Sequence, residues 1–137
     1  MLRDVNSVSQ IMKKNVVSLD ASSTVKNAIR VMTEECVGCL VVTNGLKPVG
    51  IITERDIMRC ILQDKEVLEH GIDKVMSQPL LVVDPDTAVV EALDLMKAKE
   101  IRHLPVVADD QLCGIITMHS DLLYWALGTI TRGTSTS

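Results

Sequence analysis

The tetrapeptide Gly-Ile-Ile-Thr occurs at residues 50–53 and returns at residues 114–117, 64 positions later. The same offset places Leu40 on Leu104, with no gap in between. A period near 64 that occurs twice exceeds the usual range of solenoid repeats. The sequence therefore predicts two copies of one small domain, packed together.

Both copies predict the same order of elements. A short amphipathic helix comes first, and an apolar run ended by Asp20 or by Asp84-Pro85 follows, which is typical of a buried strand. Next comes a helix with apolar residues at i, i+3, i+4 and i+7, then two strands joined by a hairpin turn, then a closing helix. The turns are expected at Asn44-Gly45 and Asp109-Asp110. The elements cover residues 8–12, 16–19, 25–32, 40–43, 49–53 and 54–62 in the first copy, and 72–76, 80–83, 89–96, 104–107, 112–117 and 120–127 in the second.

Capping residues precede the longer predicted helix of each copy. Ser22 or Ser23 stands in front of it in the first copy, and Asp86 or Thr87 in the second. Side chains of these types accept hydrogen bonds from the unpaired N–H groups of a first helical turn. We therefore expect a side-chain cap at both helices.

Composition bounds the class of protein. The chain has 137 residues, of which 47% are hydrophobic and 23% charged, which excludes a disordered or fibrous protein. A chain of this size buries about two-thirds of its surface on folding, so its core needs no disulfides. The net charge of −4 and the lack of aromatics beyond Tyr124 and Trp125 disfavour nucleic-acid binding. Since we find no signal peptide and no apolar run of membrane-spanning length, we expect a soluble, cytoplasmic protein with reduced cysteines.

The repeated order, together with Gly-Ile-Ile-Thr-Glu-Arg-Asp at 50–56 and Ile-Arg-His-Leu-Pro-Val at 101–106, resembles the CBS domain, named after cystathionine β-synthase. The resemblance implies a mixed α/β (α+β) fold in which two βαββα repeats pack sheet to sheet with pseudo-two-fold symmetry. It also implies a regulatory homodimer that binds an adenosyl ligand (AMP, ADP, ATP or S-adenosylmethionine) in clefts between the repeats. The expected divisions are repeat 1 at 8–62, a charged linker at 63–71, repeat 2 at 72–127 and a flexible tail at 128–137.

Thr53 and Asp56 are the first candidate binding residues. Thr-x-x-Asp at a strand-to-helix junction is close to a capping box, in which the two side chains bond to backbone N–H groups of the first helical turn. A carboxylate in that turn, at the edge of a cleft, can also accept both ribose hydroxyls. The two roles are compatible, and the resemblance favours ribose binding.

A phosphorylated ligand needs local positive charge in this acidic chain. Arg102 and His103 precede Leu104-Pro105-Val106 at the start of a predicted strand, where related nucleotide-binding pairs place basic residues. The alternative is an ordinary solvated pair at a strand end. In the family arrangement these two residues face Asp56 across one cleft.

The second cleft has fewer residues suited to binding a phosphorylated nucleoside. Its positions equivalent to Arg102 and His103 are Gly38 and Cys39, and its candidate hydroxyl and acid are Thr117 and Asp121, the acid standing one residue late. Adenine is expected against apolar strand edges. Lys13 and Lys14 either line the phosphate site or are exposed to solvent, and solvent exposure is the favoured interpretation. The candidate adenine contacts are Val16, Val17, Leu80 and Leu81.

The other motifs give weaker indications of function. Cys36-Val37-Gly38-Cys39 has the spacing of a redox or half-zinc motif, but no second such pair completes a metal site, so small buried residues are the favoured interpretation. Cys60 and Cys113 are interpreted as core thiols. Since no catalytic or nucleotide-loop motif is present, we expect no enzyme, no metal and no resident cofactor. Two alternatives to a nucleotide sensor stay open: a ligand-free interaction module in which Thr53 and Asp56 only cap a helix, and a thiol-redox protein using Cys36 and Cys39.

Overall fold

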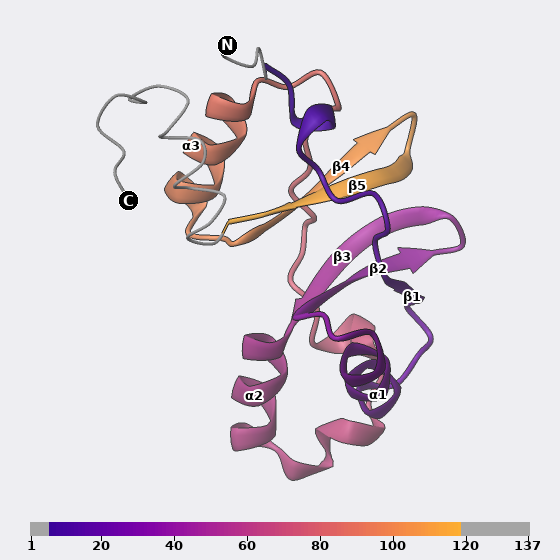
Figure 1. The fold of residues 1–137 in the computed structure, drawn as a ribbon. Coiled ribbons are helices and arrows are strands. Elements are labelled where there is room, and N and C mark those ends of the chain that lie inside the picture. The colour runs from indigo at the N-terminus through magenta and orange to yellow at the C-terminus, as the bar shows by residue number, and fades with distance from the viewer. Residues whose placement is uncertain (1–5, 119–137) are drawn as a thin grey trace.

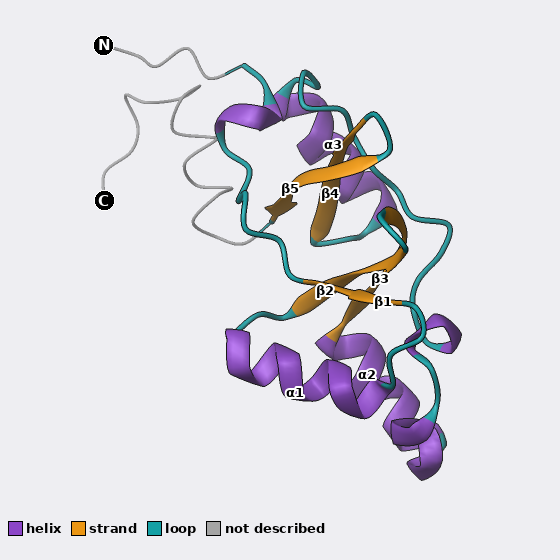
Figure 2. Cartoon of the chain, turned by 90° about the vertical axis from the view of Figure 1, so that its right-hand side faces the viewer, coloured by secondary structure: helices purple, strands orange, loops and turns teal. Residues whose placement is uncertain are grey.

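The computed structural model describes residues 6–118 of the 137-residue chain. The predicted closing helix at 120–127, the predicted tail at 128–137 and the candidate Asp121 lie outside the described residues. Figure 2 shows four layers in succession: α1 and α2, then β1 to β3, then β4 and β5, then α3. The two sheets face each other, with β3 in contact with β5, which confirms the mixed fold of two repeats packed sheet to sheet.

The first repeat forms a three-stranded sheet covered on one side by two helices (Figure 1). Strand β1 (Ser18–Asp20) runs parallel to β2 (Cys39–Asn44), which pairs antiparallel with β3 (Lys47–Thr53). Helices α1 (Val25–Glu35) and α2 (Glu54–Gln63) complete it. The apolar stripe of each helix packs on alternate strand residues because a strand turns every second side chain to one face. The fully buried members of this core are Val25, Ala28, Leu40, Val42, Ile52 and Ile72.

The second repeat repeats the register of the first. Strand β4 (His103–Ala108) pairs antiparallel with β5 (Gln111–Thr117), and α3 (Val89–Lys99) covers them. Pro105 faces Ile115 as Val41 faces Ile51, and both hairpins carry an irregularity at the equivalent place, after Val42 and after Val106. The buried core consists of Val8, Ala92, Met96, Leu104, Val106 and Ile116.

The predicted buried strand at 80–83 is wrong. Leu81 and Val82 are exposed, and only Val83 joins the sheet, through bonds from its N–H to Pro105 O (3.1 Å) and from Val107 N–H to its own carbonyl (2.9 Å). In the first repeat, Ala21 N–H extends the pairing by donating to Thr43 O at 2.8 Å. The equivalent residue is Pro85, which has no N–H to donate. The equivalent run in the first repeat also becomes a strand only from Ser18 onward.

The predicted caps are wrong by one or more residues. The cap of α1 is Thr24, whose hydroxyl accepts from Asn27 N–H at 3.1 Å, and α3 starts after Ala88 without a side-chain cap. Ser22 and Thr87 instead bond to the turns before the helices: Ser22 donates to the Asp20 carboxylate, and the Thr87 hydroxyl accepts from Asp84 N–H. Those turns therefore use the side chains that sequence spacing assigns to caps.

The two repeats exchange their first segments. The 3-10 helix η1 (Val8–Gln10) begins repeat 1 in sequence but packs on repeat 2, where Val8 N–H donates to Thr87 O and Val8 is fully buried. The 3-10 helix η3 (Ile72–Lys74) begins repeat 2 but packs on repeat 1, where Ile72 N–H donates to Ser23 O. The exchange is reciprocal, as a pseudo-two-fold axis requires.

The exchange also explains the glycine of the repeated tetrapeptide. Lys13 and Ile115 bond to each other through both backbone groups, and so do Ser77 and Ile51, so each exchanged segment crosses the partner hairpin at its glycine. A Cβ on Gly114 would stand 2.6 Å from Met12 Sδ, and one on Gly50 2.3 Å from Met76 Sδ. Only glycine admits so close a crossing without displacement.

The charged segment between the repeats is itself folded. It contains the 3-10 helix η2 (Lys65–Glu69), in which Val67 is buried against the first core. Asp64 caps it by accepting from Glu66 N–H at 2.9 Å. Within residues 6–118, no helix has the length and apolar character that crossing a membrane requires.

Candidate functional site

Two cavities lie between the repeats and are related by the 64-residue offset. The first, called the Asp56 cavity, has a volume of about 390 Å³ and combines the end of β3 and the start of α2 with the start of β4. The second, called the Cys39 cavity, has a volume of about 630 Å³ and combines the end of β5 with the start of β2. The Asp56 cavity is lined by Gly38, Ile51, Thr53, Glu54, Arg55, Asp56, Arg59, Ser77, Glu100, Ile101, Arg102 and His103.

Thr53 and Asp56 form a complete capping box at the start of α2. Asp56 N–H donates to Thr53 Oγ1 and Thr53 N–H donates to Asp56 Oδ2, both at 3.1 Å. The pair therefore satisfies two backbone donors that a helix N-terminus leaves open. The capping role predicted from the spacing is confirmed, and it fixes the Asp56 carboxylate at the cavity wall.

The carboxylate of Asp56 is held at one oxygen. Its side chain is 15% exposed, and Oδ2 also accepts from Ser77 Oγ at 3.5 Å. The other oxygen, Oδ1, has Arg59 at 3.9 Å as its ion-pair partner among the described residues. Oδ1 thus keeps the capacity to accept hydrogen bonds from a molecule in the cavity.

Arg102 and His103 line the same cavity from the second repeat. Arg102 is exposed, so its guanidinium can reach an anion in the opening, while His103 is half-buried. The four principal residues named from the sequence therefore share one cavity, two from each repeat.

His103 stands at the wall between the two cavities, since it lines both, as does Gly38. Its Nδ1 lies 3.4 Å from Thr117 Oγ1. Burial, together with the Arg102 charge, lowers the pKa of His103, and Glu54 opposes this effect. The imidazole therefore favours the neutral form, so Arg102 supplies the positive charge expected at this wall.

Further lining residues were not named as site residues from the sequence, among them Ser77, Arg59 and Glu100. Ser77 occupies the repeat position of Lys13 and bonds to Asp56, so the 64-residue offset applied to Lys13 finds it. Arg59 lies one helical turn after Asp56, a spacing that brings side chains together on a helix. Glu100 has no such sequence signal: it follows α3 with a left-handed backbone, φ 55°.

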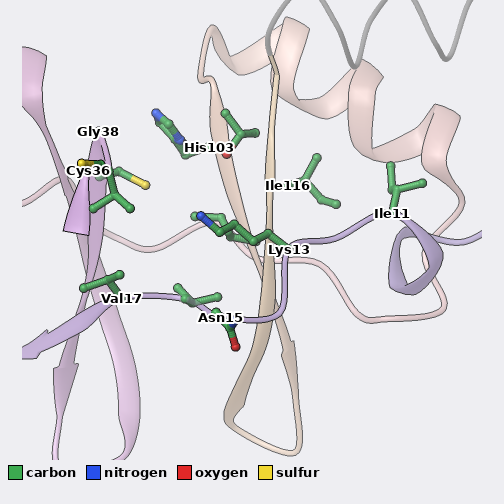
Figure 3. A pocket seen from close by; sticks show the side chains of 13 residues that line it. Ile11, Lys13, Asn15, Val17, Cys36, Gly38, His103 and Ile116 are labelled. Carbon is green, nitrogen blue, oxygen red and sulfur yellow. Dashed lines mark hydrogen bonds between the residues drawn. The ribbon is translucent and has the colours of Figure 1, made fainter.

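Only two of the four predicted adenine contacts line a cavity. Val16 and Val17 line the Cys39 cavity with Thr117, whereas neither cavity has Leu80 or Leu81 in its lining. Lys13 also lines the Cys39 cavity, and Lys14 lines neither. In Figure 3, Val17, Cys36 and Gly38 lie on one side of this cavity, with Ile11 and Ile116 on the other.

The Cys-x-x-Cys pair is not buried as expected. Cys36 is exposed and Cys39 is half-buried, and both line the Cys39 cavity. Burial raises the pKa of the Cys39 thiol to about 11, against a smaller effect of Lys13 in the other direction. Within the described part of the chain, no three His, Cys, Asp or Glu residues are grouped so that they could hold a metal ion.

Comparisons with known proteins identify the family. The family model of the CBS domain matches residues 8–63 and 72–120. The uncharacterized protein MK0525 of Methanopyrus kandleri is 37% identical over 119 residues, which cover 85% of this chain and 61% of that protein. The mitochondrial CBS domain-containing protein CBSX3 of Arabidopsis thaliana is 35% identical over 127 residues, covering 81% of this chain and 60% of that protein. The chain thus spans about 60% of the length of these curated relatives.

A solved structure is similar over nearly the full length of both chains. The crystal structure of CBSX2 in complex with AMP superposes with a TM-score of 0.75 at 27% identity, covering 92% of this chain and 98% of that one.

Proposed function

The chain belongs to the CBS-domain family and carries two copies of the domain, and we propose that it is a regulatory module that binds an adenosine-containing ligand in the Asp56 cavity. The observation that carries the proposal is the meeting of Thr53 and Asp56 from one repeat with Arg102 and His103 from the other around one cavity. Occupancy of that cavity would then be passed to a protein that the module regulates.

The residues fit a nucleoside at one end of the cavity and a phosphate at the other. Asp56 Oδ1 accepts no hydrogen bond from the described residues, and its ion-pair partner Arg59 lies 3.9 Å away, so it can accept from ribose hydroxyls. Arg102, exposed on the opposite wall, can form charge-assisted bonds to phosphate oxygens.

AMP is the first ligand to test. The cavity lining carries three guanidinium groups, of Arg55, Arg59 and Arg102, and three carboxylates, of Glu54, Asp56 and Glu100. This balance favours a short phosphate chain held by local contacts, because a triphosphate brings more negative charge than the wall can offset. A similar CBS protein, CBSX2, is known in complex with AMP. ADP, ATP and S-adenosylmethionine are the alternatives.

The test is titration calorimetry of AMP binding with Asp56→Ala. Each hydrogen bond lost to a charged acceptor costs ~1.5–3 kcal/mol, so binding should weaken roughly ten- to a hundredfold or more. Asp64→Ala is the matched control: Asp64 also caps a helix with its carboxylate but lies outside both cavities. Equal AMP affinity in wild type and Asp56→Ala, or no binding by any of the four ligands, would refute the proposal.

A second candidate function is interaction through α2 without a ligand. The capping box accounts for Thr53 and Asp56 by itself. Helix α2 also exposes two apolar side chains one turn apart, Met58 at 61% and Leu62 at 88%. Neighbouring exposed apolar side chains are typical of an interaction face.

We propose that this face of α2 forms the interface of the expected homodimer. Sedimentation analysis should give a dimer that Leu62→Glu dissociates; a monomeric wild type would contradict it.

A further inference from the structure

The corresponding walls of the two cavities differ in chemistry. Residues 100–103, at the Asp56 cavity, read Glu-Ile-Arg-His, whereas residues 36–39, at the Cys39 cavity, read Cys-Val-Gly-Cys. Three polar or charged side chains are therefore replaced by two thiols and a glycine. The Cys39 cavity has lost the groups that would bind a phosphorylated ligand on this wall and has gained a pair of thiols.

The backbone holds the two cysteines on one short turn. Cys36 ends α1 in a left-handed conformation (φ 56°), and the N–H of Val37 donates to Met32 O at 3.1 Å, which fixes this helix end. Cys39 is the first residue of β2 and pairs with Thr53. With both ends anchored, the turn holds the two cysteines at Cys-x-x-Cys spacing, and both line the same cavity.

The two thiols have different surroundings. Cys36 is exposed, with Sγ 3.8 Å from Thr33 O, so a small oxidant can reach it from solvent. Cys39 is half-buried, and its high pKa keeps it a protonated thiol. The exposure of Cys36 suits the attacking thiol, and its place on the same short turn makes Cys39 the resolving partner, which must give up its proton as it attacks because the thiolate is the nucleophile.

We propose that Cys36 and Cys39 form a reversible disulfide in the Cys39 cavity when a hydroperoxide is present, and that its closure weakens ligand binding in the Asp56 cavity. The Cys36 thiolate attacks the terminal oxygen of the hydroperoxide ROOH, the O–O bond breaks, and a sulfenic acid and RO− are formed. The RO− takes a proton from solvent and leaves as ROH, which is water when the peroxide is hydrogen peroxide. Cys39 sulfur then attacks Cys36 sulfur, the S–O bond breaks, and the hydroxyl group leaves as water with the Cys39 proton. Two thiols are oxidised and one peroxide is reduced; a dithiol reverses the step.

The link between the cavities runs through Gly38, between the two cysteines. Its carbonyl accepts from Glu54 N–H at 3.0 Å, and a Cβ placed on it would already lie 3.0 Å from Glu54 Oε1. Glu54 is the first residue of α2, whose first turn holds Asp56. Closing the disulfide changes the turn that carries Gly38, so it acts on the helix N-terminus that positions the Asp56 carboxylate. This part rests on the proposed function.

The first experiment measures the disulfide itself. Fully reduced protein is treated with hydrogen peroxide, and intact mass and thiol titration follow the reaction. We expect the loss of two hydrogen atoms and a fall from four free thiols to two, with a Cys36–Cys39 linked peptide after digestion. Cys36→Ser and Cys39→Ser should abolish the change, while Cys60→Ser and Cys113→Ser, at partly buried thiols elsewhere, should retain it. A different pairing, or four free thiols after treatment, would overturn the proposal.

The second experiment measures AMP binding by calorimetry to the reduced and oxidised forms. We expect oxidation to weaken binding about fivefold or more, the lower end of ordinary coupling between sites, in wild type but not in Cys36→Ser. A disulfide that leaves the AMP affinity within about twofold would overturn the link between the cavities. If reduced protein binds none of AMP, ADP, ATP and S-adenosylmethionine, the proposed function fails, while the mass and thiol measurements still decide the disulfide.

Discussion

Gly50 and Gly114 stand where a chain segment from the other repeat crosses a hairpin. At Gly50 the contacts below 3 Å involve only the side chain of Met76, which can rotate. At Gly114 a Cβ would also meet the carbonyl of Lys13 at 2.9 Å, which is backbone and bonded to Ile115. The two equivalent glycines therefore differ in how much their surroundings can yield.

We expect Gly114→Ala to lower the free energy of unfolding by about 2–3 kcal/mol, the upper part of the range for overpacking. Gly50→Ala should cost less, about 1 kcal/mol, because the methionine can move aside. Urea denaturation of both variants measures the difference. A Gly114→Ala protein as stable as Gly50→Ala would show that backbone crowding is not what requires the glycine.

His103 gives a pH dependence of known sign. Burial and the Arg102 charge lower its pKa in the folded chain below the ordinary 6.5. The unfolded chain therefore takes up the imidazole proton at a higher pH than the folded chain does. The contribution of His103 to stability is full above about pH 6.5 and is lost as the pH falls toward the folded pKa.

The measurement is the free energy of unfolding at about pH 7.5 and about pH 5.5 in wild type and His103→Gln. Wild type should lose more stability on acidification than the variant does, since glutamine does not titrate. An identical pH dependence in the two proteins would mean that burial does not disfavour the imidazolium at this position.

Residue patterns predicted local bonding only where no neighbouring turn competed for the same side chain. The Thr53–Asp56 capping box was predicted from its spacing and is complete in the structure. Ser22 was expected to cap α1 but donates to Asp20. Cys36 was expected to be buried, yet it is exposed at the C-terminal end of α1, in a left-handed conformation that spacing alone does not reveal.

At the scale of elements, the two hairpin turns use different backbone solutions. The turn between β4 and β5 has positive φ at both central residues, Asp109 (52°) and Asp110 (63°). The turn between β2 and β3 has its positive φ at Gly45 (66°), with open space around it. Residues other than glycine pay a steric cost in this region, although aspartate tolerates it better than most.

Asp110→Gly should therefore raise the free energy of unfolding by about 0.5–1 kcal/mol. Gly45→Ala should lower it by about 1 kcal/mol, because no neighbour is touched and only the backbone conformation is penalised. Thermal and urea unfolding of the two variants give the values. Destabilisation by Asp110→Gly would contradict the argument.

Element prediction succeeded for α1, α2, α3 and both hairpins. The first turn, however, lies at Gly45-Leu46, one residue after the predicted Asn44-Gly45, because Asn44 still pairs with Lys47 at the end of β2.

Element prediction failed at residues 80–83, where an apolar run looks like its counterpart in the first repeat. The difference lies in two donors, because Pro85 stands where Ala21 donates to Thr43 and Pro105 stands where Val41 donates to Val17. Apolar character shows that a run can be buried, but partner hydrogen bonds decide whether it becomes a strand.

At the scale of the whole molecule, the core of each repeat is completed by the first segment of the other repeat. Val8 is fully buried in the core of the second repeat, and Ile72 in that of the first. Neither position can be assigned to its core from sequence, since both segments adjoin the other repeat along the chain. The pairing of Asp56 with Arg102 around one cavity came from the family resemblance, whereas the residues alone supply only the repeat.

We expect Val8→Ala to cost about 2 kcal/mol and Ile72→Ala about 2–5 kcal/mol. Native-state hydrogen exchange should place the loss in opposite halves. Val8→Ala should speed exchange most in β4 and β5, and Ile72→Ala most in β2 and β3. If each substitution loosened the repeat next to it in sequence, the exchange of segments would be refuted.

The reciprocal crossing at Gly50 and Gly114 bears on how such a protein can be built at all. A protein with only one repeat would have an unpacked first segment and an incomplete core, and it could pack the one and complete the other only by exchanging first segments with a second molecule. Joining two repeats on one polypeptide makes this exchange intramolecular. Folding then no longer depends on protein concentration, and cutting the chain between the repeats would restore that dependence.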